Sequence, residues 1–293
     1  MQSWGNKPAM PCLWFTAVLW FGSIDSVKLA SQGLRTASTS QAAVVAVLVG
    51  PFLRGDAQGE PDEQPVRQIH VPAFFIDQTE VTVAQYAECV KARVCKPPTL
   101  ASWQEAGPNV PVTQVSWEDA TTFCRFAQKR LPSETEWEKA ARGTDGRRYP
   151  WGDEFACHFG NFGNYSMDGR CAAEGAPGKP VDVGSYPRGA SVYGVLDMAG
   201  NVWEWTADTY RRDAYKRSEA GPLVGGPEED LRVLRGGGCC SIFGLPRVAD
   251  RWALPRNYRD GDIGFRCAKS GFVTPRGAGP KTPSATRDRL EKP

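Results

Sequence analysis

The stretch that most constrains the fold runs from Gly194 to Asp208 and reads GVLDMAGNVWEWTAD. It combines two tryptophans, three carboxylates and two glycines, a mixture that neither a regular helix nor a regular strand selects. Glycines let the backbone turn with positive φ, and carboxylates beside exposed carbonyls are the ligands that a hard cation prefers. The stretch therefore predicts a loop folded around a cation. The alternative is a tight turn that leads into an aromatic core strand.

Charge and histidine content limit the possible chemistry. The 293 residues include 35 Lys and Arg against 33 Asp and Glu, and no basic block stands apart from acidic neighbours. We therefore expect no nucleic-acid partner and no anionic membrane partner. Only two histidines occur, His70 and His158, which excludes sites that need three histidine ligands.

Two segments precede the predicted folded domain. Cys12–Ser23 is an apolar run, much shorter than the roughly 20 residues that a membrane-spanning helix needs, and it predicts a signal peptide over residues 1–23. A mis-assigned start or a disordered extension is the alternative. Residues 24–41 are polar and typical of a linker. We expect a secreted or periplasmic protein without a membrane span, with one domain over 42–270 and a disordered basic tail over 271–293.

Strands are expected at both ends of the domain. Ala42–Leu53 is apolar and β-branched and predicts one or two buried strands, and Ile69–Asp77 predicts a strand that pairs with them. Ile263–Ala268 predicts the last strand. Between Thr144 and Pro187 the density of Gly, Pro, Asn and Asp predicts long connections, which we expect cysteines or cations to hold in place.

Three helices are predicted from their start signals. They begin after the N-cap residues Thr82, Ser116 and Ser133. Gln85 and Glu136 stand where the first and third helices need a capping-box partner. Gly143 stands where a glycine commonly ends a helix.

The nine cysteines predict a disulfide framework. Loss of Cys12 with a signal peptide would leave eight, an even number that suits an oxidising compartment. Local spacing pairs Cys89 with Cys95 and Cys157 with Cys171, and it leaves Cys124 to pair with Cys267 beside the adjacent Cys239 and Cys240. The alternative is that these cysteines are reduced core residues. None has the CxxC spacing of a zinc site.

Five ordered blocks carry a resemblance to a known family. They are RLPSETEWEKAARG (130–143), YPWGDE (149–154), the stretch 194–208, RVLRGGG (232–238) and IGFRCA (263–268). Together they resemble the sulfatase-modifying-factor family, which contains the formylglycine-generating enzyme. The resemblance implies an α+β fold: a single, distorted C-type-lectin-like domain with little regular secondary structure and bound calcium.

The same resemblance implies specific ligands and one disulfide. The positions that match the family's calcium loop are Asp197 and Glu204 by side chain, and Gly200 and Val202 by carbonyl. Such an oxygen-only set is what calcium prefers. A second calcium site would fall near Asn161, Phe162, Asp168 and Arg170, in a loop that is shorter here. The family's buried disulfide matches Cys124 and Cys267.

The segment that matches the family's catalytic site departs from its pattern. In the formylglycine-generating enzyme, two cysteines five residues apart follow Gly-Gly-Ser, bind copper(I) and activate oxygen. Here Gly238 stands in place of that serine, and Ser241 or Phe243 falls where the cysteines should be. Asp262 replaces an expected asparagine, whereas Trp203 matches the aromatic wall of the site.

Two functions follow from this pattern. Thiolates suit copper(I), but Cys239 and Cys240 are adjacent, and neighbouring side chains of a strand point to opposite faces. We therefore expect a calcium-stabilised binding module that takes a peptide, partner protein or small molecule in a surface cleft, without formylglycine-generating activity. The alternative is an oxygen-dependent oxidase or tailoring enzyme. It would act on a protein cysteine or a small metabolite, with Cys239 or Cys240, copper and Trp203 as its site.

Overall fold

The computed structural model describes residues 42–100, 103–163, 171, 177–217, 221–226, 228–239 and 246–271. The predicted signal peptide, the linker and the tail beyond Gly271 lie outside these residues, and so do Cys240, Asp168 and Arg170. In the part of the chain that is described, no helix has the length and apolar character needed to cross a membrane.

Three α-helices form where the start signals predict them. They are α1 (Val83–Lys91), α2 (Trp117–Phe126) and α3 (Glu134–Arg142). Each begins in a capping box, and the box of α2 uses Asp119, whose Oδ2 accepts the Ser116 N–H at 2.9 Å. These side chains satisfy N–H groups that the first turn of a helix leaves unpaired. Gly143 ends α3 with φ of 80°.

The strands of the described residues form three sheets. One has the order β1 (Val44–Val47), β4 (Phe74–Asp77), β9 (Ala268–Ser270), and a second pairs β2 (Gly50–Arg54) with β3 (Arg67–Val71). The third has the order β7 (Arg251–Pro255), β6 (Leu231–Arg235), β5 (Trp203–Thr209), β8 (Ile263–Gly264). All pairs are antiparallel except β5 with β8.

The last predicted strand is wrong as a single element. Its first two residues form β8 beside β5, and Ala268 begins β9 beside β4 in another sheet. The segment between them makes other hydrogen bonds: the Phe265 carbonyl accepts the Val81 N–H, and the Cys267 N–H is donated to Asp77 Oδ2. Tertiary partners therefore divide a run that looks continuous in sequence.

The N-terminal strand predictions need a similar correction. Pro72, which has no N–H to donate, lies between β3 and β4, so Ile69–Asp77 belongs to two strands in two sheets. The strands of Ala42–Leu53 pair with both of them, as predicted. They are not fully buried, because β1 is an edge strand and Val44 is 49% exposed.

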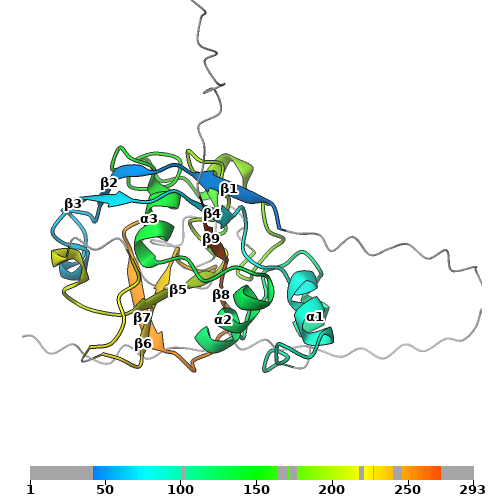
Figure 1. Cartoon of the computed structure of the whole chain (residues 1–293). Helices are drawn as coiled ribbons and strands as arrows, with labels where there is room; N and C mark the ends of the chain where they lie inside the picture. Colours follow the sequence, from blue (N-terminus) through cyan, green and yellow to red (C-terminus); the bar gives the residue numbers. More distant parts are fainter. Residues whose placement is uncertain are drawn as a thin grey trace, which may run out of the picture.

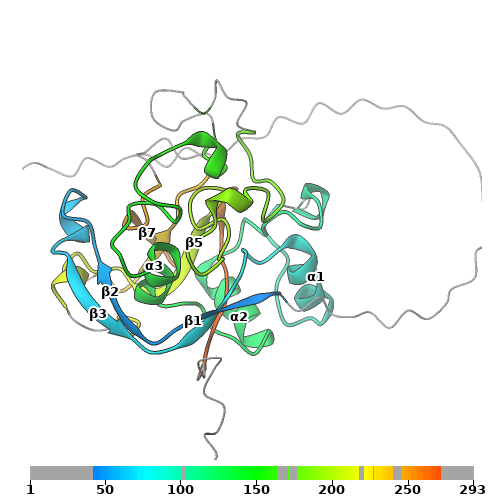
Figure 2. The same ribbon diagram turned by 90° about the horizontal axis from the view of Figure 1, so that it is seen from above.

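Helix α3 lies at the centre of the fold. In Figure 1 it lies between the β2–β3 hairpin and the sheet that contains β5 and β6, and it contacts both. Its Trp137, Ala140 and Ala141 are fully buried in one core cluster with Phe52 and Ile69. Figure 2 shows α1 and α2 together at the opposite side of the molecule from β2 and β3. The chain thus forms one α+β domain.

Three disulfides have the predicted pairing, two of them from local spacing and Cys124–Cys267 from the remaining cysteines and the family resemblance. Cys89–Cys95 closes the end of α1, Cys157–Cys171 closes a loop, and Cys124–Cys267 joins residues 143 positions apart. The last of these ties α2 to the segment between β8 and β9. Between α3 and β5 the named elements are the short 3-10 turns Cys157–Phe159 and Pro187–Gly189, which agrees with the predicted long connections.

Candidate functional site

The stretch from Gly194 to Asp208 forms a turn that leads into strand β5. Asp197 and Asn201 have left-handed backbones, with φ of 56° and 65°. At Gly200, φ is 86°, and a Cβ atom would lie 2.5 Å from the Asn161 carbonyl oxygen. Only glycine therefore lets this turn approach the loop at Asn161 so closely. The three carboxylates of the stretch have different surroundings.

Glu204 is a fully buried partner of Arg266. Arg266 donates from Nε to Oε2 and from NH2 to Oε1, both at 2.7 Å, and Trp137 Nε1 donates to Oε2 at 2.9 Å. A carboxylate has about four lone-pair sites. These three bonds leave one site, on Oε1, and the guanidinium compensates the charge.

Asp197 interacts with a second carboxyl group, that of Glu80, and has no guanidinium paired to its own side chain among the described residues. Its Oδ2 accepts the Gly184 N–H at 2.6 Å, and its carboxyl group lies within hydrogen-bonding reach of Glu80. Burial is the largest cause that raises the pKa of Glu80 well above its ordinary value, followed by the charge of Asp197. Burial likewise raises the pKa of Asp197. Glu80 Oε1 accepts a hydrogen bond from Asn201, but Oε2 is buried without a partner among the described residues.

These contacts test whether the loop fits calcium. Two buried carboxyl groups with one unpartnered oxygen are costly to ionise, and the nearby Arg266 is already paired with Glu204. A hard cation beside Asp197 would compensate that charge, with the Gly200 and Val202 carbonyls as co-ligands. The described residues hold no cluster of three or more His, Cys, Asp or Glu side chains suited to a metal, so main-chain oxygens would have to complete such a site. Asp197 fits this role better than Glu204.

Sequence reasoning missed Glu80. It lies 121 positions from its partner Asn201, and no local pattern links the two. Its only local signal is a carboxylate placed two residues before the N-cap of α1.

The predicted second calcium site is only partly described. Asn161 is buried, and its Nδ2 donates to the Lys179 carbonyl at 2.8 Å and to Asn201 Oδ1 at 3.2 Å. Its own Oδ1 is buried and has no partner among the described residues. Because Asp168 and Arg170 lie outside those residues, the second site stays a prediction.

Trp203, Gly238 and Asp262 come together next to the ends of β5 and β6. The Trp203 N–H is donated to the Asp262 carbonyl at 2.7 Å. A Cβ atom at Gly238 would lie 2.4 Å from Asp262 Oδ2 and 3.1 Å from Trp203 Cδ1. A side chain at this position would displace one of its neighbours, so the position that the resemblance gives to a serine is already filled.

The surroundings of Asp262 are acidic and aromatic. The Tyr258 hydroxyl donates to Asp260 Oδ2 at 3.2 Å. Burial, then Asp260, and more weakly Asp262, raise the pKa of Tyr258. We call Trp203, Tyr258, Asp260 and Asp262 the acidic–aromatic face. Arg259 within it forms an ion pair with Asp119 at 2.5 Å.

Cys239 packs against the loop that contains Gly163. Its side chain is fully buried, and its N–H is donated to the Asn201 carbonyl at 2.9 Å. Gly163 packs so closely on it that a Cβ atom there would lie 1.4 Å from the Cys239 carbonyl oxygen. Cys240 lies outside the described residues, so a joint copper site of the two thiols stays a prediction.

Known proteins resemble this chain over most of its length. A family model described as "Sulfatase-modifying factor enzyme 1-like domain" matches residues 31–271. The formylglycine-generating enzyme of Streptomyces coelicolor is 35% identical, over 77% of this chain and 88% of that protein. The inactive C-alpha-formylglycine-generating enzyme 2 of Mus musculus is 31% identical, over 86% and 96%.

A solved structure has the same fold. PvdO from Pseudomonas aeruginosa matches with a TM-score of 0.66 at 23% identity, over 82% of this chain and 100% of that one. At this identity the likeness concerns the fold alone. Relatives at similar sequence identity thus include one named for an enzymatic activity and one named inactive.

Proposed function

Because the chain belongs to the sulfatase-modifying factor family, we propose that it is a secreted or periplasmic, calcium-stabilised member that binds a peptide without copper-dependent oxidation. The observation that carries this proposal is the packing of Asp262 Oδ2 against Gly238, at the position where the family's site has a serine. A carboxylate is a hard ligand, unlike the soft thiolates that hold copper(I). The three disulfides support an oxidising compartment.

The acidic–aromatic face suits a basic peptide. Asp260 and Asp262 offer carboxylates, and Trp203 and Tyr258 offer ring faces that attract a guanidinium or ammonium group. Arg259, which precedes Asp260 in the sequence, is already paired with Asp119. A peptide with Lys or Arg next to an apolar residue would therefore satisfy both the charge and the rings.

Calcium would have a structural role in this protein. Asp197 and the carbonyls of Gly200 and Val202 would hold it, with Glu80 and the remaining Oε1 lone pair of Glu204 as further oxygen donors. Bound calcium supplies charge compensation in that place and joins the turn before β5 to the segment that precedes α1. This link would hold Trp203 in position at the start of β5.

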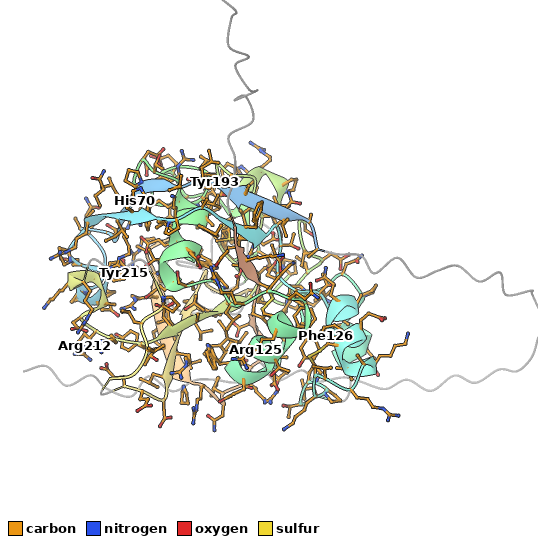
Figure 3. All side chains as sticks on the ribbon, in the orientation of Figure 1. His70, Arg125, Phe126, Tyr193, Arg212 and Tyr215 are labelled. Carbon is orange, nitrogen blue, oxygen red and sulfur yellow. A yellow bond between two sulfur atoms is a disulfide. The ribbon has the colours of Figure 1, made fainter. Side chains whose placement is uncertain are left out.

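Peptide binding tests the proposal directly. The calcium-loaded protein is titrated with basic peptides and with acidic peptides of the same length, with tryptophan fluorescence as the readout. We expect micromolar, saturable binding of the basic set only, and at least a tenfold loss in the Trp203→Ala variant. Phe126→Ala is the control, because Phe126, labelled in Figure 3, is a 40% exposed aromatic residue of α2 that does not belong to the acidic–aromatic face. Equal affinity of both peptide sets would contradict the proposal.

The oxidase is the second candidate, because Cys239 lies next to Gly238 on the chain and thus close to Trp203. The test titrates the reduced protein with copper(I) and follows oxygen uptake with a cysteine-containing peptide. On the proposal above, neither stoichiometric copper binding nor aldehyde formation occurs. Tight binding of one copper with oxygen-dependent aldehyde formation would replace the binding module by the oxidase.

A further inference from the structure

A pocket of about 230 Å³ lies between β2, the turn at residues 55–58 and the chain that follows α3. It shares no residue with the acidic–aromatic face or with the calcium loop. Its charged lining residues are Asp56, Arg142, Arg148 and Asp153, and its large apolar ones are Leu53 and Val66. The hydrogen bonds already made by the charged groups decide which ligand it can take.

Two arginines in the pocket have hydrogen-bonding capacity that the described residues do not use. Arg142 is 3% exposed, its NH1 donates to the carbonyls of Leu53 and Gly55, and its NH2 lies 3.5 Å from Glu138 Oε1, yet its Nε is buried without a partner among the described residues. Arg148 Nε is likewise buried without a partner, and no side-chain hydrogen bond or ion pair of Arg148 occurs within the described part of the chain. A buried donor without an acceptor costs free energy.

The two carboxylates in the wall accept no side-chain hydrogen bond from Arg142 or Arg148 among the described residues. Asp56 accepts the Gln58 N–H on Oδ1 at 2.9 Å and Arg247 NH1 on Oδ2 at 3.0 Å. Burial alone would raise the pKa of Asp56, but these hydrogen bonds, together with the charges of Arg247 and, more weakly, Arg148, outweigh burial and lower the pKa, so the group is ionised. Asp153 accepts the backbone N–H of Arg148 on Oδ1 at 2.9 Å. Both carboxylates thus already accept hydrogen bonds from other groups, whereas the Arg148 side chain donates none within the described residues, so an anion in the pocket would give its guanidinium an acceptor.

The rest of the wall is apolar and exposed. Leu53 and Val66 are 36% and 39% exposed although both line a concave site. An engineered cavity of about 150 Å³ holds a benzene molecule, so this pocket has room for a ring that also carries a charged group. An inorganic oxyanion has no apolar part, so Leu53 and Val66 would stay exposed to water when it binds.

We propose that this pocket binds a small organic carboxylate, with the carboxylate group at Arg148 and the hydrocarbon part against Leu53 and Val66. Arg142 adds a second guanidinium to the wall. Guanidinium groups bind carboxylates in planar, two-point geometry. The site is independent of the proposed peptide-binding function, since it uses other residues.

Titration with three anions tests the site. The full-length protein, labelled with ¹⁵N, is titrated with benzoate, acetate and inorganic phosphate at constant ionic strength, and the arginine Nε–H resonances are followed. We expect saturable shifts with benzoate, at least tenfold weaker binding of acetate, and no saturation with phosphate. Absence of saturation with benzoate would overturn the proposal, and phosphate binding as tight as benzoate would overturn the assignment to an organic acid.

Matched variants locate the site. Arg148→Gln should weaken benzoate binding at least tenfold, whereas Arg147→Gln should leave it unchanged, because the Arg147 guanidinium is paired with Asp145 at 2.6 Å. Leu53→Ser is a second variant, which tests the site even if Arg148→Gln does not fold. It should weaken the binding of benzoate but not the binding of acetate. Equal losses in Arg147→Gln and Arg148→Gln would show general charge attraction and contradict the pocket.

Discussion

Glu204 and Asp197 belong to one stretch of sequence, and the family resemblance assigns both to one calcium ion, yet the fold surrounds them differently. Glu204 accepts three hydrogen bonds from Arg266 and Trp137. Asp197 lies against Glu80, a second buried carboxyl group. The comparison teaches that a carboxylate's partner depends on which distant segment the fold brings to it.

This difference separates two kinds of stabilisation. The Glu204–Arg266 pair is complete within the chain, so its contribution should be present with or without a metal. The cation near the Asp197–Glu80 pair, Arg266, is already paired with Glu204, so the contribution of the Asp197–Glu80 pair should depend on calcium and on pH. Four changes can break or sharpen this distinction.

Replacement of Glu204 by Gln should have the largest effect. It leaves the Arg266 guanidinium buried without its counter-ion, and breaking such a pair costs about 3–5 kcal/mol. Urea unfolding should therefore show a large loss of unfolding free energy both in calcium and in chelator. If the loss occurs in calcium alone, Glu204 acts mainly as a calcium ligand.

Replacement of Asp197 by Asn should affect only the calcium-loaded protein. A ligand at 100 times its Kd stabilises the folded state by about 2.7 kcal/mol, and the variant should lose that gain. In chelator the variant should be as stable as the wild type or more stable, because the repulsion with Glu80 is removed. Glu80→Gln is a matched second variant, because it removes the other carboxyl group of the pair. Calorimetric titration should find weaker calcium binding in both variants than in the wild type. Unchanged calcium affinity would rule out this ligand set.

The calcium effect should grow with pH. The folded-state pKa values of Glu80 and Asp197 are raised, so the folded apo protein binds more protons than the unfolded chain. Its stability should fall as pH rises above the ordinary carboxyl values of about 4. Calcium needs the ionised groups, so the Tm difference between calcium and chelator should increase from about pH 5 to 8 by linkage. A constant difference across this range would contradict the calcium assignment.

Asp208, the third carboxylate of the stretch, should give the smallest effect. It accepts the N–H groups of Glu134 at 2.6 Å and Leu223 at 2.9 Å, and burial, followed by the charge of Glu134, raises its pKa to about 7. The stability that its protonation contributes is complete below about pH 4 and is lost as pH rises through 7.

Asp208→Asn should remove that pH dependence. The unfolding free energy of the variant should vary less between pH 4 and 7, equally in calcium and in chelator. At low pH the variant should lose about 1 kcal/mol, because the Asn side chain has one oxygen and can replace only one of the two acceptors of Asp208. Thermal melts at several pH values provide the measurement. If the effect of Asp208→Asn depended on calcium, Asp208 would contribute to calcium binding as Asp197 does, and this prediction would be wrong.

Local rules predicted much of the fold. The capping boxes at Thr82 and Ser133 join side chains to backbone groups three residues away, and such contacts are readable from spacing. The disulfides within short loops, Cys89–Cys95 and Cys157–Cys171, follow the same logic. The third pair, Cys124–Cys267, followed from counting and from the family resemblance.

The candidate site was less predictable. Trp203, Asp262 and Gly238 were identified from their departures from the family pattern, but their mutual packing depends on the distances between β5, β6 and β8. The two pocket arginines carry no local signature, and the position of Glu80 before α1 does not reveal its partners, because a buried group is recognisable only from what surrounds it. The division of Ile263–Ala268 between two sheets has the same cause.

The sequence by itself determined where the helices begin, which short-range cysteines pair, and the family to which the ordered blocks belong. Each of these depends on contacts within a few residues or on the order of motifs along the chain. Only the tertiary structure decided that Glu204 pairs with Arg266, that Asp197 meets Glu80, and that Arg148 lacks an acceptor among the described residues. Charge compensation in a buried site is a sum over neighbours that are far apart in sequence, and those neighbours exist only after folding.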